Sequence, residues 1–288
     1  MPRSRFVPHP PRRPAVVAGA SSGIGAATAA ALAAAGHPVV LGARRLDRCE
    51  EVARAIRAAG GEAHVRRLDL AEAASVEEFA HAAQDALGPI DIMVSSAGHA
   101  VPGTALGTSP KDFAHTVEVN LLGAHRLVVA LAPAMVRRHH GDLVFVSSDI
   151  LRIPRPLMAA YMASKWGLDG LVRALQLELE GTGVRATIIQ PGQTLTDMGT
   201  DWGPDTTTEV LGEWVRFGAA RHSHFLRPPA VAAAVMAAVT TPPGSHLPLI
   251  EVQPEAPVTP DTPPDTPPDT PPDIPPDIHD TRNAGGTP

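Results

Sequence analysis

Three side chains in the middle of the chain have types and spacing that suit proton transfer. Tyr161 and Lys165 stand four residues apart, and Ser148 precedes the tyrosine by thirteen residues at the end of an apolar run. Apolar residues at three- and four-residue steps through 157–180 predict a helix there, and residues i and i+4 share one helix face. A nearby ammonium group lowers the pKa of a phenol, which is about 10 in water. Such a pair could exchange a proton with an alcohol or ketone near neutral pH, although by itself it could also lie on a solvated helix face.

A glycine-rich segment near the N-terminus favours the catalytic interpretation. The apolar run 15–18 predicts a short buried strand, which leads into Gly19-Ala-Ser-Ser-Gly23-Ile-Gly25 and then an alanine-rich helix. A strand, a glycine turn and a helix start form a cradle for a nucleotide pyrophosphate, because the backbone can approach and the free amides favour an anion. The spacing is G-x-x-x-G-x-G rather than G-x-G-x-x-G, and a plain tight turn is the alternative for this segment alone. Its position ahead of Ser148 and Tyr161 indicates one nucleotide-dependent site.

With these motifs in this order, residues 15 to 252 resemble the short-chain dehydrogenase/reductase family. The matching segments are Gly19-x-x-x-Gly23-Ile24-Gly25, Asp69-Leu70, Ser95-Ser96-Ala97-Gly98, Asn120, Ser148, Tyr161-x-x-x-Lys165 and Pro191-Gly192-x-x-x-Thr196. Two positions depart from the family pattern: Ala18 replaces the usual threonine, and Ser95-Ser96 replaces Asn-Asn or Asn-Ala. Both positions brace the floor of the cofactor site, so these departures bear on cofactor affinity and not on the class of reaction.

The resemblance implies a role for each of four catalytic residues. Tyr161 would be the general acid in reduction and the general base in oxidation, and Lys165 would lower the tyrosine pKa and hold the nicotinamide ribose. Ser148 would hydrogen-bond the substrate carbonyl oxygen. Asn120 would bind a water in a proton relay to Lys165. Ser147 is the competing serine, but the thirteen-residue offset to Tyr161 favours Ser148.

The residues after the second predicted strand bear on the choice of cofactor. An acidic residue there would hydrogen-bond the ribose of NAD, whereas an arginine suits the 2′-phosphate of NADP. Arg44 and Arg45 follow Ala43, so NADP(H) is the predicted cofactor and NAD the less favoured one; solvated loop arginines are the alternative. Asp47 could pair with Arg45, which favours Arg44. With the resemblance, the predicted cofactor-binding residues are Gly19, Ser21, Ser22, Gly23, Ile24, Gly25, Arg44, Arg45, Asp69, Leu70, Ser96, Ala97, Gly98, Asn120, Tyr161, Lys165, Pro191, Gly192, Thr194 and Thr196.

Strand-like and helical patterns alternate along the chain. Continuous apolar strands between helices are typical of a parallel sheet covered on both faces. We therefore expect an α/β fold: a single-domain, Rossmann-like, doubly wound parallel sheet of about seven strands over residues 15–252. The predicted strands are 15–18, 39–41, 63–68, 90–94, 143–146, 184–189 and 247–252, and the predicted helices after the first are 46–59, 75–86, 110–138, 157–180 and 229–239.

Segments outside this pattern have their own expectations. Residues 1–14 are predicted to be a disordered arm, and 253–288 a disordered acidic, proline-rich tail with a four-residue repeat. A proline-recognising partner for the tail is the less favoured alternative. Residues 193–226 are the predicted substrate lid and hold two of the three tryptophans. They predict an apolar pocket or helices packed over the sheet edge, with equal support. Arg152 and Arg155 could recognise an anion, although exposed loop arginines are the favoured interpretation.

Composition limits the other classes of function. The net charge of -6 resides in the tail, which has seven acidic residues and one arginine, so no broad basic surface indicates nucleic acid. The single Cys49 rules out an intramolecular disulfide and fits a reducing, cytoplasmic location. No apolar run approaches the ~20 residues of a membrane span. His222 and His224 lack companions for a metal site, and no metal is predicted.

The sequence thus predicts an NADP(H)-dependent oxidoreductase that interconverts a ketone or other carbonyl and a secondary alcohol, with a largely apolar small-molecule substrate. The alternatives are a non-catalytic NADP-binding regulator, which the intact residues Asn120, Ser148, Tyr161 and Lys165 oppose, and an isomerase or dehydratase that uses the same residues. Helices 110–138 and 157–180 carry apolar residues on more than one face. With the family resemblance, this predicts a homodimer or homotetramer.

Overall fold

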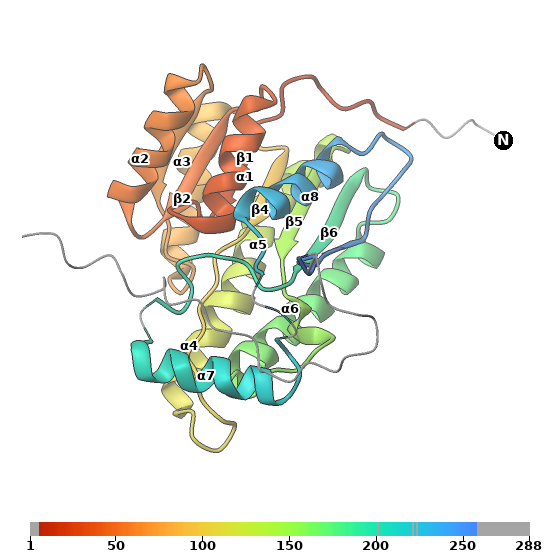
Figure 1. Ribbon diagram of the computed structural model, residues 1–288. Coiled ribbons are helices and arrows are strands. Elements are labelled where there is room, and N and C mark those ends of the chain that lie inside the picture. Colours follow the sequence, from red (N-terminus) through yellow and green to blue (C-terminus); the bar gives the residue numbers. More distant parts are fainter. Residues whose placement is uncertain (1–5, 201, 221, 223, 258–288) are drawn as a thin grey trace, which may run out of the picture.

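The computed structural model describes residues 6–257 except 201, 221 and 223; the predicted tail from residue 258 onward lies outside the described residues. Seven strands form one sheet in the order β3-β2-β1-β4-β5-β6-β7, and neighbouring strands are parallel (Figure 1). The strands are β1 (Ala15–Ala18), β2 (Val39–Ala43), β3 (Ala63–Arg67), β4 (Ile92–Ser95), β5 (Gly141–Val146), β6 (Val184–Pro191) and β7 (Leu249–Val252). The predicted doubly wound parallel sheet is confirmed.

Helices connect the strands and cover both faces of the sheet. They are α1 (Gly23–Ala34), α2 (Leu46–Ala58), α3 (Ala73–Leu87), α4 (Pro110–Val117), α5 (Gly123–Arg138), α6 (Ala159–Glu178), α7 (Pro204–Arg216) and α8 (Pro228–Thr240), with a π-helical turn η1 (Glu118–Leu122) and a 3-10 turn η2 (Asp149–Leu151). The helix predicted over 110–138 is therefore one helical stretch with a π-helical turn in its middle. Ser109 caps it, since its hydroxyl accepts a hydrogen bond from the Asp112 amide at 3.0 Å.

Alternate residues of the buried strands enter two separate cores. Val16 and its equivalents on β2, β4 and β5 pack with α3, α5 and α6. Val17 and its equivalents pack with α1, α2 and α8 on the other face. Strand side chains point alternately to the two faces of a sheet, so strands buried on both faces need continuous apolar sequence. Each fully buried aliphatic side chain contributes about 1.5–3 kcal/mol through the hydrophobic effect.

The stretch Pro110–Arg138 is long and apolar enough to cross a membrane, with 44% of its most apolar window buried, which the sequence analysis did not anticipate. Ala124, Leu127 and Leu131 on this stretch are at most 2% exposed and lie in the core under the sheet. This is the arrangement of a core helix in a globular domain. Its outer face keeps large apolar side chains exposed, among them Val129 at 59%.

The strand order reverses at β1 and β4. β1 lies between β2 and β4, so the connections leave β1 and β4 in opposite directions. In open α/β sheets, ligands bind at such a reversal point, outside the carboxyl ends of the strands. The segments that follow β1, β2, β4, β5 and β6 all begin at this end of the sheet.

At the amino ends of the strands, the Arg13 side chain connects the N-terminal segment to the domain. Its side chain is 2% exposed and donates to the carboxylate of Asp142 and, at 2.8 Å, to the carbonyl oxygen of Val239. Arg185 donates to the same carboxylate, 2.7 Å from Nε to Oδ1. Residues 1–14 are expected to form a disordered arm, but the segment at Arg13 is held against the domain. The reason is that the Arg13 guanidinium is paired with the carboxylate of Asp142, at the start of β5.

We predict that Arg13→Met lowers the free energy of unfolding by about 3–5 kcal/mol, since it leaves a buried carboxylate with one cation fewer. The control is Arg12→Met, whose partner Glu62 is 48% exposed, and it should change stability by less than about 1 kcal/mol. Urea unfolding of the two variants measures the difference. Equal effects would contradict the structural role given to Arg13.

Candidate active site

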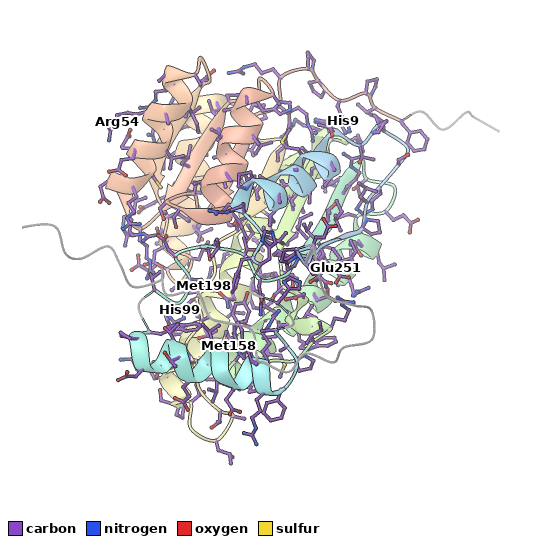
Figure 2. All side chains as sticks on the ribbon, in the orientation of Figure 1. His9, Arg54, His99, Met158, Met198 and Glu251 are labelled. Carbon is purple, nitrogen blue, oxygen red and sulfur yellow. The ribbon has the colours of Figure 1, made fainter. Side chains whose placement is uncertain are left out.

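The predicted catalytic residues meet at the carboxyl edge of the sheet. Ser148 follows β5 and caps η2, Tyr161 and Lys165 lie in the first two turns of α6, and Asn120 lies in η1. All four side chains are buried, with 2 to 8% exposure. Figure 2 shows the labelled Met158 and Met198 between the sheet and α7, whereas His9 lies at the far end of the molecule.

A hydrogen bond from Lys165 to the sheet positions the pair. The Lys165 ammonium donates to the carbonyl oxygen of Val146 at 2.8 Å and lies 5.5 Å from the centroid of the Tyr161 ring. The Ser148 side chain lies close enough to the Tyr161 phenol to lower its pKa. Ser147, the competing serine, has a buried hydroxyl with no hydrogen-bond partner among the described residues. The structure therefore brings Ser148, and not Ser147, to the tyrosine.

The electrostatics of the pair differ from the expectation. Burial raises the pKa of Tyr161 to about 12, against the opposing effects of its hydrogen bond to Ser148 and the charge of Arg155. Burial also lowers the pKa of Lys165 to about 8. The expected lowering of the tyrosine pKa by Lys165 is thus not found in this structure, because desolvation disfavours the charged form of both groups. The phenol is protonated at neutral pH.

Asn120 links three elements through its side-chain amide. Its Nδ2 donates to the His99 carbonyl oxygen at 2.8 Å and to the Ser164 hydroxyl at 2.9 Å, and its Oδ1 accepts from the His99 amide at 2.8 Å. The π-helical turn places this side chain between the β4 loop and α6; such turns often occur at functional sites. Asn120 therefore braces the loop that follows β4, while the expected water relay to Lys165 stays a prediction.

The predicted cofactor residues gather along the same edge. They follow the ends of β1 to β4 and β6 or lie in the glycine turn, and they are Gly19, Ser21, Ser22, Gly23, Ile24, Gly25, Arg44, Arg45, Asp69, Leu70, Ser96, Ala97, Gly98, Pro191, Gly192, Thr194 and Thr196. Some of them hold the edge in shape: Asp69 Oδ1 accepts from the Ala71 amide at 3.1 Å, and Thr194 Oγ1 donates to the Gly192 carbonyl oxygen at 2.8 Å. Leu70 packs in the core at 5% exposure.

The glycine turn fits a nucleotide. Gly19 has a φ of 82°, and a Cβ there would lie 2.6 Å from the backbone of Ala97; a Cβ at Gly25 would lie 2.2 Å from the Gly19 carbonyl oxygen. Larger residues would close this turn. The first turn of α1 has no side-chain cap and no acidic residue, so its free amides and the positive end of the helix dipole favour an anion. The cradle therefore suits the pyrophosphate of a dinucleotide.

Arg45 is the arginine that reaches the cradle. Its Nη2 donates to the hydroxyls of Ser21 and Ser22 at 3.0 and 3.1 Å. Its ion-pair partner is Asp197, with 3.3 Å between Nη1 and Oδ2, and not the expected Asp47. The reason for preferring Arg44 over Arg45 was therefore wrong. Arg48, one turn into α2, contacts the same carboxylate at 2.8 Å and was missed because nothing in the sequence orients it.

A buried ion pair beside Ser148 was also missed. Arg155 is 8% exposed and makes two hydrogen bonds to Asp149, of 2.7 and 2.8 Å. Its guanidinium lies 5.2 Å from the ring centroid of Trp214. The preference for an exposed loop arginine is wrong at this position, because Asp149, next to Ser148, neutralises it. Arg152 is exposed and pairs with Glu251 at 2.8 Å.

Residues of the predicted lid place apolar side chains beside Tyr161. Trp202 and Trp214 pack against a cluster that includes Met158 and Tyr161. Both indole N–H groups are already bonded, to the carbonyl oxygens of Ala100 at 3.0 Å and Pro156 at 3.1 Å. The rings therefore present carbon surface near the phenol, which favours the apolar-pocket interpretation of residues 193–226. Within the described part of the chain, no group of three or more His, Cys, Asp or Glu side chains is arranged to hold a metal ion.

Comparison with known proteins identifies the family of this chain. Residues 13–207 match the family model described as short chain dehydrogenase. A glycine betaine reductase of Emericella nidulans is 37% identical over 238 residues, which are 83% of this chain but 18% of that protein. A putative ketoacyl reductase of monensin polyketide synthesis from Streptomyces virginiae is 36% identical over 207 residues, 69% of this chain and 79% of that protein.

Solved structures agree with these sequence matches. An alcohol dehydrogenase from the archaeon Thermococcus sibiricus, complexed with 5-hydroxy-NADP, superimposes with a TM-score of 0.72 at 30% identity, over 84% of this chain and 96% of that one. A short-chain dehydrogenase/reductase from Burkholderia phymatum, with the same TM-score and 26% identity over 82% of this chain and 88% of that one, is in complex with NAD. By its family model, its relatives and its seven-stranded sheet, this chain belongs to the short-chain dehydrogenase/reductase family of oxidoreductases.

Proposed function

We propose that this protein interconverts a carbonyl compound and a secondary alcohol, with NADP(H) as the hydride carrier. The observation that carries the proposal is the buried Tyr161 phenol, which lies beside the Ser148 side chain and the Lys165 ammonium. This group faces the same sheet edge as the glycine cradle. Proton transfer and nucleotide binding are thereby available at one site.

The side chains divide the proton chemistry among them. The nicotinamide, when bound, supplies the hydride. In reduction, Tyr161 donates its proton to the oxygen of the substrate while the Ser148 hydroxyl hydrogen-bonds the same oxygen. A tyrosine pKa of about 12 keeps this proton on the phenol at neutral pH. The charge of Arg155 and the Ser148 side chain favour the phenolate that remains.

Two groups of observations support NADP(H) over NAD(H). Ala43 ends β2 without a carboxylate that could bind the ribose hydroxyls, and Arg45 and Arg48 lie next to the cradle. Guanidinium groups bind phosphate oxygens in bidentate fashion. Structural relatives bind NADP, although the Burkholderia protein binds NAD. We therefore assign the 2′-phosphate of NADP(H) to Arg45, with Arg44 and Arg48 beside it.

The substrate that fits this site is largely apolar. The walls near Tyr161 are Met158, Trp202 and Trp214, and both indole N–H groups are engaged. The charges of Asp149 and Arg155 neutralise each other. Beside these apolar side chains, the Tyr161 phenol and the Ser148 hydroxyl are polar groups that suit one carbonyl oxygen.

An assembly through the outer faces of α4, α5 and α6 is part of the same proposal. Leu122 and Val129 on one helical stretch, and Trp166 and Leu177 on α6, are 41 to 76% exposed. Apolar side chains of this size on two long helices favour burial against another copy, and homo-oligomers are most often symmetric. We propose a homodimer or homotetramer.

Tyr161→Phe is expected to lower kcat at least 100-fold and to leave NADPH binding nearly unchanged, since general acid catalysis contributes about 10²–10⁴-fold. NADPH oxidation over a panel of apolar ketones measures the first effect, and nucleotide fluorescence titration the second. The control is Ser147→Ala, which removes a neighbouring buried hydroxyl and should keep most of the activity. More than a tenth of wild-type kcat in Tyr161→Phe would overturn the assignment.

Arg45→Met should weaken NADPH binding by about tenfold or more and NADH binding much less, because charge-assisted hydrogen bonds contribute about 1.5–3 kcal/mol. Arg54→Met, at the outer side of α2, the helix that Arg45 precedes (Figure 2), is the matched control for loss of one positive charge. The Kd values of NADPH and NADH, measured for both variants, test whether Arg45 binds the 2′-phosphate. An equal loss for NADPH and NADH in Arg45→Met would remove the 2′-phosphate from this arginine.

Because the pKa of Lys165 is lower in the folded protein than in the unfolded chain, the free energy of unfolding should depend on pH. Between about pH 8 and the unfolded value near 10.5, the unfolded chain binds the extra proton, so stability rises with pH. Without added nucleotide, the Tm of the wild type relative to Lys165→Met should therefore increase from pH 7 to pH 9.5. A Tm difference that stays constant over this range would show that the Lys165 ammonium is not desolvated.

A further inference from the structure

The start of the lid crosses the predicted cofactor site between two turns. On one side, a Cβ at Gly23 would lie 3.1 Å from the Thr196 side chain, so this threonine covers the glycine turn after β1. On the other side, a Cβ at Gly98 would lie 3.0 Å from the terminal methyl of Met198, which covers the turn after β4. Asp197 lies between Thr196 and Met198 in the chain and is the acidic residue of this segment.

Asp197 holds the lid to the arginines beyond β2. Its Oδ2 lies 2.8 Å from Nη1 of Arg48 and 3.3 Å from Nη1 of Arg45. The other amino group of Arg45 donates to the hydroxyls of Ser21 and Ser22. One guanidinium thus joins the lid carboxylate to the glycine turn.

These contacts can exchange for others. The side chains of Arg45, Arg48 and Asp197 are 41 to 50% exposed, so the ion pairs are screened by water and salt and contribute little each. A phosphate monoester carries more charge than a carboxylate and has three acceptor oxygens for the same guanidinium donors. A ribose hydroxyl carries no charge and cannot compete in this way.

We propose that Asp197 is an internal competitor for the 2′-phosphate. The phosphate of NADP(H) displaces the carboxylate from Arg45 and Arg48 and frees the lid segment 193–200 from the β2–α2 turn, whereas NAD(H) leaves the ion pairs in place. This inference rests on the proposed NADP(H) function and adds to it that the attachment of the lid depends on which nucleotide is bound.

Asp197→Asn tests the competition. Removing the carboxylate should tighten NADPH binding by about two- to fivefold, the fold-change that corresponds to a surface ion pair of up to about 1 kcal/mol, and should leave the Kd of NADH within experimental error. Asp205→Asn, in the first turn of α7, removes the same charge from the same lid and should change neither Kd. The gain should vanish when Arg45 and Arg48 are both replaced by methionine.

The lid itself gives a second readout. The Thr200 amide donates to the Asp197 carbonyl oxygen, and the Met198 amide donates to the Thr196 hydroxyl. With saturating NADP⁺, hydrogen exchange of the peptide that contains these amides should be faster than with saturating NAD⁺ in the wild type. It should be equal with the two nucleotides in Asp197→Asn.

Three outcomes would overturn the inference: unchanged NADPH affinity in Asp197→Asn, weaker NADPH affinity in that variant, or equal lid exchange with both nucleotides in the wild type. They differ from failure of the proposed function. If the wild type binds neither nucleotide, or binds NADH more tightly than NADPH, the assignment of the cofactor itself is wrong. If the wild type prefers NADPH and Asp197→Asn keeps the wild-type ratio of affinities, the competition alone is refuted.

Discussion

The hydrogen bond from the Lys165 ammonium to the Val146 carbonyl oxygen connects α6 to the sheet, and the geometry of the candidate site depends on it. Val146 is the last residue of β5, and Ser148 follows two residues later, so the same contact positions the serine and the tyrosine. The ammonium is buried, and its desolvation lowers the pKa of Lys165 to about 8. Burial of a cation costs less free energy when its N–H donors have acceptors, and the carbonyl oxygen of Val146 supplies one such acceptor.

Ion pairs hold the two edges of the sheet in different ways. At the edge opposite the site, Arg13 and Arg185 share the buried carboxylate of Asp142, an arrangement that cannot rearrange without exposing a charge to an apolar interior. At the site, the pairs of Asp197 with Arg45 and Arg48 are half-exposed and exchangeable. The same residue types therefore stabilise the fold at one edge and can respond to a ligand at the other, because burial sets how much each pair contributes.

The ion pair of Asp149 and Arg155 links the catalytic edge to the lid. Asp149 directly follows Ser148, and Arg155 lies over the ring of Trp214 on α7. The Arg155 side chain, which packs on Trp214, is thereby bonded to the residue next to Ser148. The charge of Arg155 lowers the pKa of Tyr161 and that of Asp149 raises it, so the pair leaves burial as the dominant influence on the phenol.

The sequence by itself determined the doubly wound sheet, the order of the motifs and the four residues proposed to be catalytic, because each depends on local spacing: apolar runs for buried strands, glycines for a tight turn, and an i, i+4 pair on one helix face. Only the tertiary structure decided which charges meet. Arg45, Arg155 and Arg13 all look like exposed arginines in the sequence, yet their partners lie 152, 6 and 129 residues away along the chain. The pKa of Tyr161 was also a tertiary matter, since the sequence shows the neighbouring lysine but not the burial that outweighs it.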